Sequence, residues 1–318
     1  MHRDRVPPEP IPIPEPIRGS TVLVTGGAGF VGSHLARALA GASTVRVVDD
    51  LSTGDRDRVP SGVTFVEGDL RETGVVAPAA DGVDYVFHQA GLVSVPESAR
   101  RPVESHERNV DATLAVLEAA READARVVFA SSAAVYGPPS SIPIAEDDPT
   151  DPTSPYGVDK LAADHYTRLY DDRYGVETVA LRYFNVYGPG QRSGVINAFL
   201  DQVRAGEPLV VEGDGEQTRD FVHVHDVVRA NLAAATTAAT GRAYNVGTGE
   251  STRIGDLAAT VRELAGGDAA IRHTEPRAGD LEQSCADIGR AQETLGFEPT
   301  VPLEDGLADL LAVGTAQQ

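Results

Sequence analysis

The stretch TVLVTGGAGFVGSHLARAL, residues 21–39, joins a short apolar run, three spaced glycines and a second apolar pattern. The β-branched residues over 21–25 predict a buried strand, and the spacing of apolar residues after the glycines predicts a helix. Gly26, Gly29 and Gly32 form a G-x-x-G-x-x-G turn between the two. A strand, a glycine-rich turn and a helix in this order are typical of the first unit of a doubly wound α/β sheet.

Strand and helix patterns continue to alternate after this unit. Apolar runs predict strands at 43–54, 63–70, 83–91, 125–132 and 176–188. Helical patterns cover about 104–122 and 156–173, and a loop rich in proline, serine and aspartate covers 137–155. The alternation predicts an α/β fold with a doubly wound, Rossmann-type parallel sheet.

The regular alternation ends after residue 188, where short strand and helix pieces begin. A helical pattern at 223–236 and a strand at 243–249 precede a final α/β portion that ends near residue 313. We therefore expect three parts. They are a proline-rich, disordered leader over 1–18, a Rossmann domain over 19–183 to which 223–245 returns, and a smaller C-terminal α/β lobe over 184–313.

Composition restricts the class of protein. Acidic residues outnumber basic ones by 48 to 27, giving a net charge of −21, which disfavours nucleic acid and anionic membranes as partners. The acidic, lysine-poor composition has two interpretations, solubility alone or adaptation to high salt, and we favour the second. GC-rich coding is another reason for a low lysine content. The sequence has no run of 18 apolar residues and no signal peptide, which predicts a cytoplasmic protein. The histidines show no metal-ligand spacing, and Cys285 is the single cysteine, so we expect neither a metal nor a disulfide.

The glycine turn and the acids that follow it predict a dinucleotide site. Such a turn lets backbone approach a pyrophosphate held at a helix N-terminus. Asp49 lies 17 residues after Gly32 at the end of the next strand, where a carboxylate binds ribose hydroxyls and repels a 2′-phosphate. NAD is thus favoured over NADP, with Asp50 sharing the role and Asp69 and Leu70 framing the adenine. The alternative for Asp49 is a turn or N-cap acid.

Lys160 is the only lysine in the chain and follows Tyr156 by four residues. Residues four apart lie on one face of a helix. Ser132 ends the preceding strand, and carboxyl ends of parallel strands line the ligand crevice. We therefore expect these three side chains to meet over a bound nicotinamide.

The chemistry of a tyrosine beside a lysine explains why arginine has not replaced this lysine. A free tyrosine has a pKa of about 10, and a nearby ammonium lowers it toward neutrality. A compact ammonium also reaches the nicotinamide ribose, where a planar guanidinium fits less well. The alternative is that Lys160 is an ordinary solvated helix residue.

Together these motifs resemble the extended short-chain dehydrogenase/reductase family, in its NAD-dependent epimerase/dehydratase branch, from Thr21 to about residue 310. The resemblance rests on TGGAGFVGSHL, VVDDLSTG, GDLR, VFHQAG, NVDATLAVLEAA, SSAAVYG, PYGVDK, LRYFNVYGP, GDGEQTRDFVHVHDV, YNVGTGE and RAGDLEQSCADIGRA. It implies a nucleotide-sugar substrate and tightly held NAD. It also implies these cofactor-binding residues: Gly26, Gly29, Phe30, Val31, Asp49, Asp50, Asp69, Leu70, Gln89, Ala90, Tyr156 and Lys160.

The resemblance also implies roles for the catalytic side chains. Tyr156 would take the proton from the sugar 4-hydroxyl as hydride leaves C4, while Ser132 hydrogen-bonds the same oxygen. Lys160 would hold the cofactor ribose and tune Tyr156. The 4-keto intermediate would then turn over in the pocket and take hydride back on its other face.

In the C-terminal lobe, the resemblance implies contacts to the nucleotide sugar. Asn185 would contact the diphosphate, Arg219 and Arg277 would clamp it, and Asp280 would bind the nucleotide ribose. For Arg219, the alternative is a structural ion pair with Asp220 or Asp226. Val195 and Phe199 would form walls of the nucleotide pocket, and Glu212 stands where some relatives have an aromatic residue beside the base. Ser284 would be a small gate residue that admits N-acetylated sugars. If the alignment slips by one, Cys285 takes this position.

Ala133 and Ala134 follow Ser132, where dehydratases and decarboxylases of the family carry carboxylates. Alanine performs no acid–base chemistry, so the resemblance favours the UDP-glucose 4-epimerase subgroup. The resemblance implies interconversion of UDP-glucose and UDP-galactose, and the small gate residue extends this to their N-acetyl forms. The alternatives are another nucleotide-sugar enzyme (a dehydratase, decarboxylase or reductase), an L-threonine dehydrogenase, an NAD-sensing module or a structural protein. The family usually forms homodimers through two helices, here those near 104–122 and 156–173.

Overall fold

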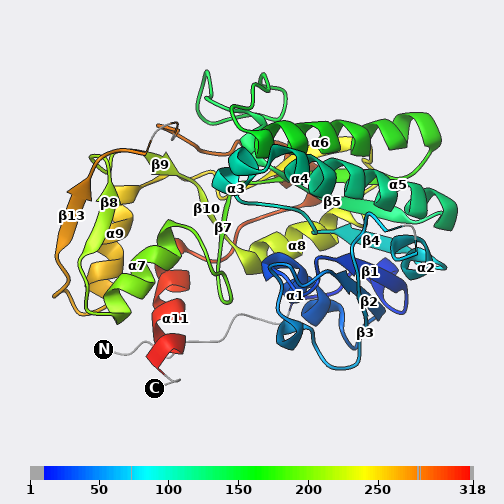
Figure 1. The fold of residues 1–318 in the computed structure, drawn as a ribbon, viewed down its shortest axis with the longest axis horizontal. Helices are drawn as coiled ribbons and strands as arrows, with labels where there is room; N and C mark the ends of the chain where they lie inside the picture. The colour runs from blue at the N-terminus through cyan, green and yellow to red at the C-terminus, as the bar shows by residue number, and fades with distance from the viewer. Residues whose placement is uncertain (1–10, 73, 278, 280, 316–318) are drawn as a thin grey trace.

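The computed structural model describes residues 11–72, 74–277, 279 and 281–315. A sheet of seven parallel strands forms its centre, in the order β11-β6-β5-β4-β1-β2-β3, which confirms the predicted Rossmann-type fold (Figure 1). In that order the strands are β11 (Arg242–Val246), β6 (Thr178–Tyr183), β5 (Arg126–Ser132), β4 (Tyr85–His88), β1 (Thr21–Thr25), β2 (Thr44–Asp49) and β3 (Thr64–Glu67).

Helices cover both faces of this sheet because its central strands are apolar on both sides. In β1, Val22 and Val24 belong to one buried cluster, whereas Leu23 belongs to another. Alternate residues of a strand point to opposite faces. The first cluster includes α1 (Phe30–Leu39) and α8 (Val224–Ala234), and the second includes α2 (Val76–Ala80) and α5 (Ala112–Ala123).

The helical stretch predicted at 104–122 consists of three parts. They are α4 (Pro102–His106), a π-helical turn over Glu107–Asp111, and α5. A separate short helix, α3 (Val95–Arg100), precedes them. The π turn places an extra residue in the helix, and such turns are frequent at functional sites.

The long helix α6 (Pro155–Tyr174) has clear end signals in the sequence. The Oγ of Ser154 accepts a hydrogen bond from the amide of Gly157 at 3.1 Å, and proline occupies the first helical position. Gly175, with φ 68°, ends the helix in the left-handed conformation. Figure 1 shows α6 above the sheet beside α4 and α5.

The C-terminal lobe has a small core of its own, which includes Phe199, Leu209, Leu257 and Leu310. The parallel pair β8 (Leu209–Glu212) and β13 (Ile271–Thr274) lies against α7 (Val195–Arg204) and α9 (Ile254–Leu264) (Figure 1). The remaining elements are β7 (Asn185–Tyr187), β9 (Thr218–Arg219), β10 (Phe221–His223), β12 (Thr252–Arg253), α10 (Gly289–Leu295), α11 (Leu303–Thr315) and 3-10 turns at Glu15–Ile17, Arg56–Arg58 and Ala133–Val135.

The chain returns from this lobe to the main sheet before it ends. Helix α8 packs on α1, and β11 forms the edge strand beside β6 in parallel register. The segment expected to return, 223–245, therefore lies within the Rossmann half of the molecule.

The N-terminal segment differs from the disordered leader predicted over 1–18. From residue 11 it packs on the core, with Ile13 8% and Ile17 0% exposed. The Nε of Arg18 donates a hydrogen bond to the carbonyl of Ile13 at 3.0 Å. The prediction of disorder does not hold for 11–18, because Ile13 and Ile17 bury enough apolar surface to fix the segment. Residues 1–10 lie outside the described residues.

Candidate active site

A cavity of about 1300 Å³ opens at the carboxyl ends of the central strands. Its lining includes the glycine turn, the ends of β5 and β6, and residues of the C-terminal lobe. Pockets for drug-sized ligands measure about 300–1,000 Å³. This cavity is therefore large enough for two ligands side by side.

The glycine turn fits a dinucleotide pyrophosphate. Gly26 has φ 67°, and a Cβ there would lie 2.7 Å from the amide nitrogen of Ala90. A Cβ on Gly32 would lie 2.2 Å from the carbonyl oxygen of Gly26. Gly29 is the N-cap of α1, whose first residues Phe30 and Val31 line the cavity. The turn thus needs glycine, and it leaves the helix N-terminus open to an anion.

Asp49 lies at the end of β2, as predicted, and is 8% exposed. Its Oδ2 accepts a hydrogen bond from the amide of Ala28 at 2.9 Å, and its Oδ1 accepts one from Leu51 at 2.9 Å. Burial raises the pKa of this carboxyl, and the backbone hydrogen bonds oppose the rise. Asp49 therefore holds the glycine turn in place while it also lines the cavity.

Charged pairs surround the rest of this end of the cavity. Asp50 accepts a hydrogen bond from Arg108 at 2.9 Å, and Asp69 accepts one from Arg71 at 2.9 Å. Burial raises the pKa of Asp50, but hydrogen bonds from Ser52 and Arg108 hold it below its usual value. The lining also includes Leu70, Gln89 and Ala90.

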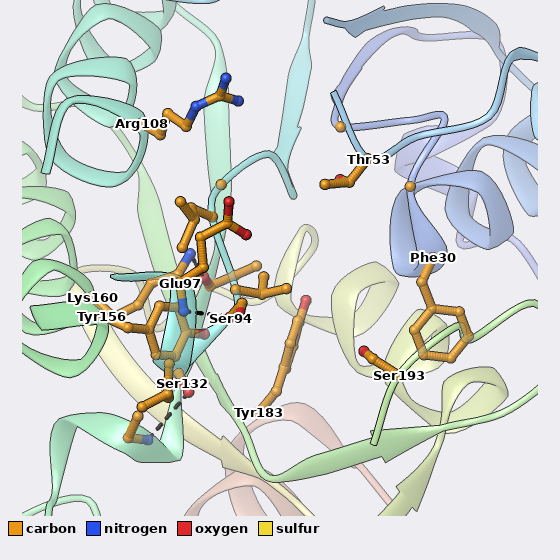
Figure 2. A pocket seen from close by; sticks show the side chains of 18 of the residues that line it. Phe30, Thr53, Ser94, Glu97, Arg108, Ser132, Tyr156, Lys160, Tyr183 and Ser193 are labelled. Carbon is orange, nitrogen blue, oxygen red and sulfur yellow. Dashed lines mark hydrogen bonds between the residues drawn. The ribbon is translucent and has the colours of Figure 1, made fainter. Parts of the chain in front are cut away.

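Ser132, Tyr156 and Lys160 converge at the other end, beside the carboxyl end of β5 (Figure 2). Ser132 accepts a hydrogen bond from the amide of Ala134 at 3.2 Å. The Nζ of Lys160 donates to the carbonyl of Ala130 at 2.9 Å. Tyr156 is 8% and Lys160 3% exposed, so neither is a solvated surface residue.

Burial dominates the electrostatics of the pair. Burial raises the pKa of Tyr156, and a hydrogen bond with Ser132 opposes the rise. Burial lowers the pKa of Lys160 to about 8, and the nearby Asp159 carboxylate opposes that change. Burial therefore outweighs the lowering of the Tyr156 pKa that the sequence predicts. The physical reason is that both groups are removed from water and the ammonium is hydrogen-bonded to Ala130 instead.

Buried hydrogen bonds fix the helix and the strand that carry these side chains. The Oγ of Ser98 accepts from the amide of Tyr156 at 3.1 Å. Asp164, one helical turn beyond Lys160, accepts from Ser131 at 2.8 Å and from the Nε of Arg182 at 3.0 Å. Asp164 thus ties α6 to β5 and β6 beneath the site.

Asn109, in the π turn, is a site residue that the sequence reasoning missed. Its Nδ2 donates to the carbonyl of Leu92 at 3.1 Å, and its buried Oδ1 has no hydrogen-bond partner among the described residues. A Cβ built on Gly91 would lie 2.6 Å from this oxygen and 3.4 Å from the Nζ of Lys160. A polar residue within an apolar helical pattern was the signal available in the sequence.

A chain of hydrogen bonds also connects β4 with this turn. The hydroxyl of Thr113 donates to the carbonyl of Asn109 at 2.6 Å, so it must accept at 3.0 Å from the Nε2 of His88. The Nδ1 of His88 then accepts from Thr25 at 2.7 Å. Burial, with a smaller effect of Lys160, lowers the pKa of His88 to about 3. His88 is therefore neutral, with its proton on Nε2.

In the C-terminal lobe, the cavity lining includes Asn185, Arg219, Arg277 and Ser284, and their contacts with a nucleotide sugar stay a prediction. Arg219 donates to the carbonyl of Leu281 at 2.7 Å, and Arg277 forms a 3.0 Å ion pair with Glu212. The lining includes Ser284 and not Cys285, whose pKa burial raises to about 11. Ser284 is thus the gate candidate that faces the ligand space.

The two acids considered as structural partners of Arg219 have other partners. Asp220 accepts hydrogen bonds from the amides of Thr248 and Gly249 at 2.7 and 3.0 Å. Asp226 accepts from the hydroxyl of Thr300 at 2.7 Å and forms an ion pair with an arginine of its own helix.

Two of the predicted pocket walls lie elsewhere. Phe199 is 0% exposed within the core of the lobe, and Val195 packs against the same core rather than lining the cavity. Helix α7 turns its apolar side toward α9 and β8, and the role of both residues as nucleotide contacts stays a prediction. Asp280 lies outside the described residues.

Comparisons with known proteins agree with this geometry. The model of the NAD dependent epimerase/dehydratase family matches residues 22–247. A putative UDP-glucose 4-epimerase from Methanocaldococcus jannaschii is 37% identical over 294 residues, which cover 90% of this chain and 95% of that protein.

Solved structures resemble the chain along most of its length. The UDP-N-acetylglucosamine 4-epimerase from Methanobrevibacter ruminantium, in complex with UDP-N-acetylmuramic acid, is 33% identical with a TM-score of 0.91, over 95% of this chain and 100% of that one. The UDP-glucose 4-epimerase from Thermus thermophilus, in complex with NAD, is 38% identical with a TM-score of 0.84, over 91% of this chain and 96% of that one.

Proposed function

Because this chain belongs to the NAD-dependent epimerase/dehydratase family, we propose that it is a UDP-sugar 4-epimerase. NAD is its cofactor, and UDP-glucose and UDP-galactose are its substrates; the relatives named UDP-glucose 4-epimerase support this choice. The observation that carries the proposal is the convergence of Ser132, Tyr156 and Lys160 at the cavity, with alanines rather than carboxylates directly after Ser132.

The three side chains divide the proton chemistry. Tyr156 takes the proton from the sugar 4-hydroxyl, and Ser132 hydrogen-bonds the same oxygen and holds it in position. Lys160 binds the cofactor ribose and favours the phenolate once its ammonium turns toward the ligand. NAD, when bound, supplies a hydride acceptor for C4. The 4-keto sugar would turn over in the wide cavity and take the hydride back on the other face of C4, while Tyr156 returns the proton to the C4 oxygen.

The alanines argue against elimination and decarboxylation. Ala133 and Ala134 both line the cavity directly after Ser132. A dehydratase needs a group there that moves the C5 proton and protonates the leaving 6-hydroxyl, and alanine does neither. A reductase or an L-threonine dehydrogenase on this scaffold would instead produce NADH in net amounts.

The remaining cofactor contacts follow from the geometry of the cavity. The turn at Gly26 and Gly29, with Phe30 and Val31, holds the pyrophosphate, and Asp49 with Asp50 holds the adenosine ribose. The adenine and the nicotinamide are framed by Asp69, Leu70, Gln89 and Ala90.

The substrate occupies the part of the cavity lined by the C-terminal lobe. Arg219 and Arg277 bind the UDP diphosphate beside Asn185, since a guanidinium matches the geometry of phosphate oxygens. Ser284, a small residue that is 5% exposed at the sugar end, leaves room for an N-acetyl group. We therefore include UDP-N-acetylglucosamine and its C4 epimer among the substrates.

The working form we propose is a homodimer. Helices α4 and α6 pack side by side and carry exposed apolar residues, including Val103 at 71% and Val158 at 51% exposure. Leu169, further along α6, is 41% exposed. Pairing these helices with those of a second copy would bury that surface.

We also propose a cytoplasmic setting of high salt. A net charge of −21 with a single lysine suits a protein that stays hydrated in concentrated salt. Cys285, the only cysteine, is 6% exposed and suits a reducing compartment. Among the described residues, no helix is long and apolar enough to cross a membrane.

The test is an incubation of purified protein with UDP-glucose, UDP-galactose and their N-acetyl forms, without added NAD, in low and high salt. We expect interconversion within a C4 pair, resolved by chromatography, without net NADH. Conversion that needs added NAD and yields equal amounts of NADH would contradict the epimerase and indicate a dehydrogenase.

A further inference from the structure

A loop of the C-terminal lobe, residues 188–194 between β7 and α7, crosses to the Rossmann half; we call it the cross-lobe loop. The Nε2 of His34 on α1 lies 2.9 Å from the carbonyl oxygen of Pro189, within hydrogen-bond distance. Arg192 forms a 2.6 Å ion pair with Asp55, which follows β2. A Cβ on Gly190 would lie 3.8 Å from the Cζ of Arg58. The loop thus rests on the first turns of α1 and on the segment after β2.

Two arginines face the cavity where these halves meet. Arg58 comes from the Rossmann half and Arg192 from the cross-lobe loop, and both line the cavity. Burial is the main cause that lowers the pKa of Arg58. The positive charge of the nearby Arg192 lowers this pKa further, whereas the Asp55 carboxylate raises it. Asp55 bonds Arg192 directly, so one carboxylate stands against two guanidiniums.

A third arginine lies at this cluster. Arg37 donates a hydrogen bond to the carbonyl of Arg58 at 3.3 Å. Three arginines thus lie close together in a chain whose acidic residues outnumber its basic ones by 48 to 27. Placing like charges together costs free energy unless an anion joins them. The arrangement therefore indicates a ligand with negative charge at this rim of the cavity.

The position of the rim identifies the anion. Phe30 opens α1 directly after the glycine turn, and Figure 2 shows it with Ser193 of the cross-lobe loop on the side of the pocket opposite Tyr156 and Lys160. A dinucleotide whose nicotinamide reaches Tyr156 carries its diphosphate past the start of α1. Guanidiniums bind phosphate oxygens with two parallel hydrogen bonds.

We propose that Arg58 and Arg192 form a clamp, one arginine from each half, on the diphosphate of the bound NAD. This inference rests on the proposed cofactor and adds the element that retains it. The nucleotide sugar leaves from the lobe side, while NAD leaves only after the cross-lobe loop separates from α1. The cofactor therefore stays bound through successive turnovers.

The test measures NAD release from the holoenzyme. Protein as purified is denatured to determine its NAD content, and native protein is mixed with an excess of an unrelated dehydrogenase that reduces any NAD set free. Arg58→Ala and Arg192→Ala should each release NAD roughly tenfold faster, as expected for a lost charge-assisted hydrogen bond. Added salt should speed release from the wild type more than from the double variant.

Asp55→Asn separates the clamp from a simple strap. If the Arg192–Asp55 ion pair merely ties the loop down, Asp55→Asn releases NAD as fast as Arg192→Ala. If both arginines bind the diphosphate, freeing Arg192 from its carboxylate leaves the release rate unchanged or lower. The matched control is Arg173→Ala, an arginine 69% exposed on the far end of α6, which should behave as wild type.

The clamp is overturned if Arg58→Ala and Arg192→Ala release NAD at the wild-type rate, or if Asp55→Asn speeds release as much as Arg192→Ala. If the purified wild-type protein contains NAD, these results overturn the clamp alone. If the wild-type protein contains no NAD and binds none that is added, the cofactor proposal fails together with the clamp.

Discussion

The two walls of the cavity differ in how firmly they hold their functional side chains. On the β5–α6 wall, the supporting ion pair of Asp164 and Arg182 has side chains 0% and 4% exposed. On the lobe wall, the ion pair of Arg277 and Glu212 has side chains 63% and 43% exposed. A buried pair keeps one geometry, whereas an exposed pair exchanges partners readily. In the proposed function, the reacting groups therefore lie on a fixed wall, and the substrate is bound by an adaptable one.

The fixed wall should show the largest effect when its reacting group is removed. Tyr156→Phe lacks the phenolic proton acceptor and should lower kcat by roughly 10² to 10⁴. The ring still fills its buried site, so the melting temperature and the NAD content should match the wild type. Chromatographic assay of epimerised sugar measures the loss, and a variant with more than a tenth of wild-type activity would assign the proton transfer elsewhere.

Asp164→Asn tests the support beneath that wall. It leaves the buried Arg182 without its full counter-charge, which typically costs about 3–5 kcal/mol of unfolding free energy. Urea denaturation measures the change. Asp172→Asn, in a pair whose side chains are 72% and 69% exposed, is the control and should leave stability unchanged. Equal effects of the two variants would contradict a rigid support.

The pH dependence of stability tests the burial of Lys160. The folded pKa is lowered to about 8 from its usual 10.5, so the folded protein loses this proton before the unfolded chain does. Carrying the ammonium therefore costs stability below pH 8, and this cost declines as pH rises toward 10.5.

Lys160→Met carries no such cost. Its unfolding free energy, minus that of the wild type, should be largest below pH 8 and should fall between pH 8 and 10.5. Urea titrations of both proteins in the same nucleotide state measure this difference. A difference that does not change with pH would show that Lys160 keeps an ordinary pKa.

On the adaptable wall, we expect a change of specificity rather than a loss of activity. Ser284→Tyr fills space at the sugar end and should lower kcat/KM for the N-acetyl sugars by about tenfold or more, while UDP-glucose is still converted. Cys285→Val serves as the control, because Cys285 does not line the cavity. A similar loss for both classes of sugar would place the N-acetyl group elsewhere.

The smallest effect should come from the exposed pair. Arg277→Ala should raise the KM for UDP-sugars a few-fold, with kcat and the urea midpoint unchanged, because water and Arg219 compensate for much of its charge. Steady-state kinetics measure the split. A fall in kcat without a change in KM would show that Arg277 acts on the transition state and that the lobe wall is as fixed as the other.

The same difference between the walls governs how much could be predicted from the sequence. The turn at Gly26, the acid Asp49 and the pair Tyr156 and Lys160 were predicted because each depends on local spacing along one strand or helix. The burial of Phe199 in the core of the lobe was not predicted, because its environment depends on how α7 packs on α9, which no local pattern encodes. The contact of Arg192 with Asp55 joins residues 137 apart in sequence, so it could be found only in the folded protein.

The direction of the Tyr156 pKa was also beyond local reasoning. Spacing places an ammonium near the phenol, but burial and the Ala130 carbonyl decide where the ammonium points. The packing of residues 11–18 on the core was not predicted for a related reason. Proline content indicates an extended backbone, but it does not indicate whether Ile17 is buried in the core.

The return of β11 to the edge of the main sheet has a consequence for how such a chain diversifies. Its nucleotide-binding half is interrupted in sequence, so a new substrate lobe cannot be gained by simple fusion at one end. Evolution, or an engineer, must exchange segments on both sides of α8 while preserving the β6–β11 pairing. Recombination of this enzyme with a homologue therefore requires several matched crossovers, and new specificities arise more readily from point changes within the lobe.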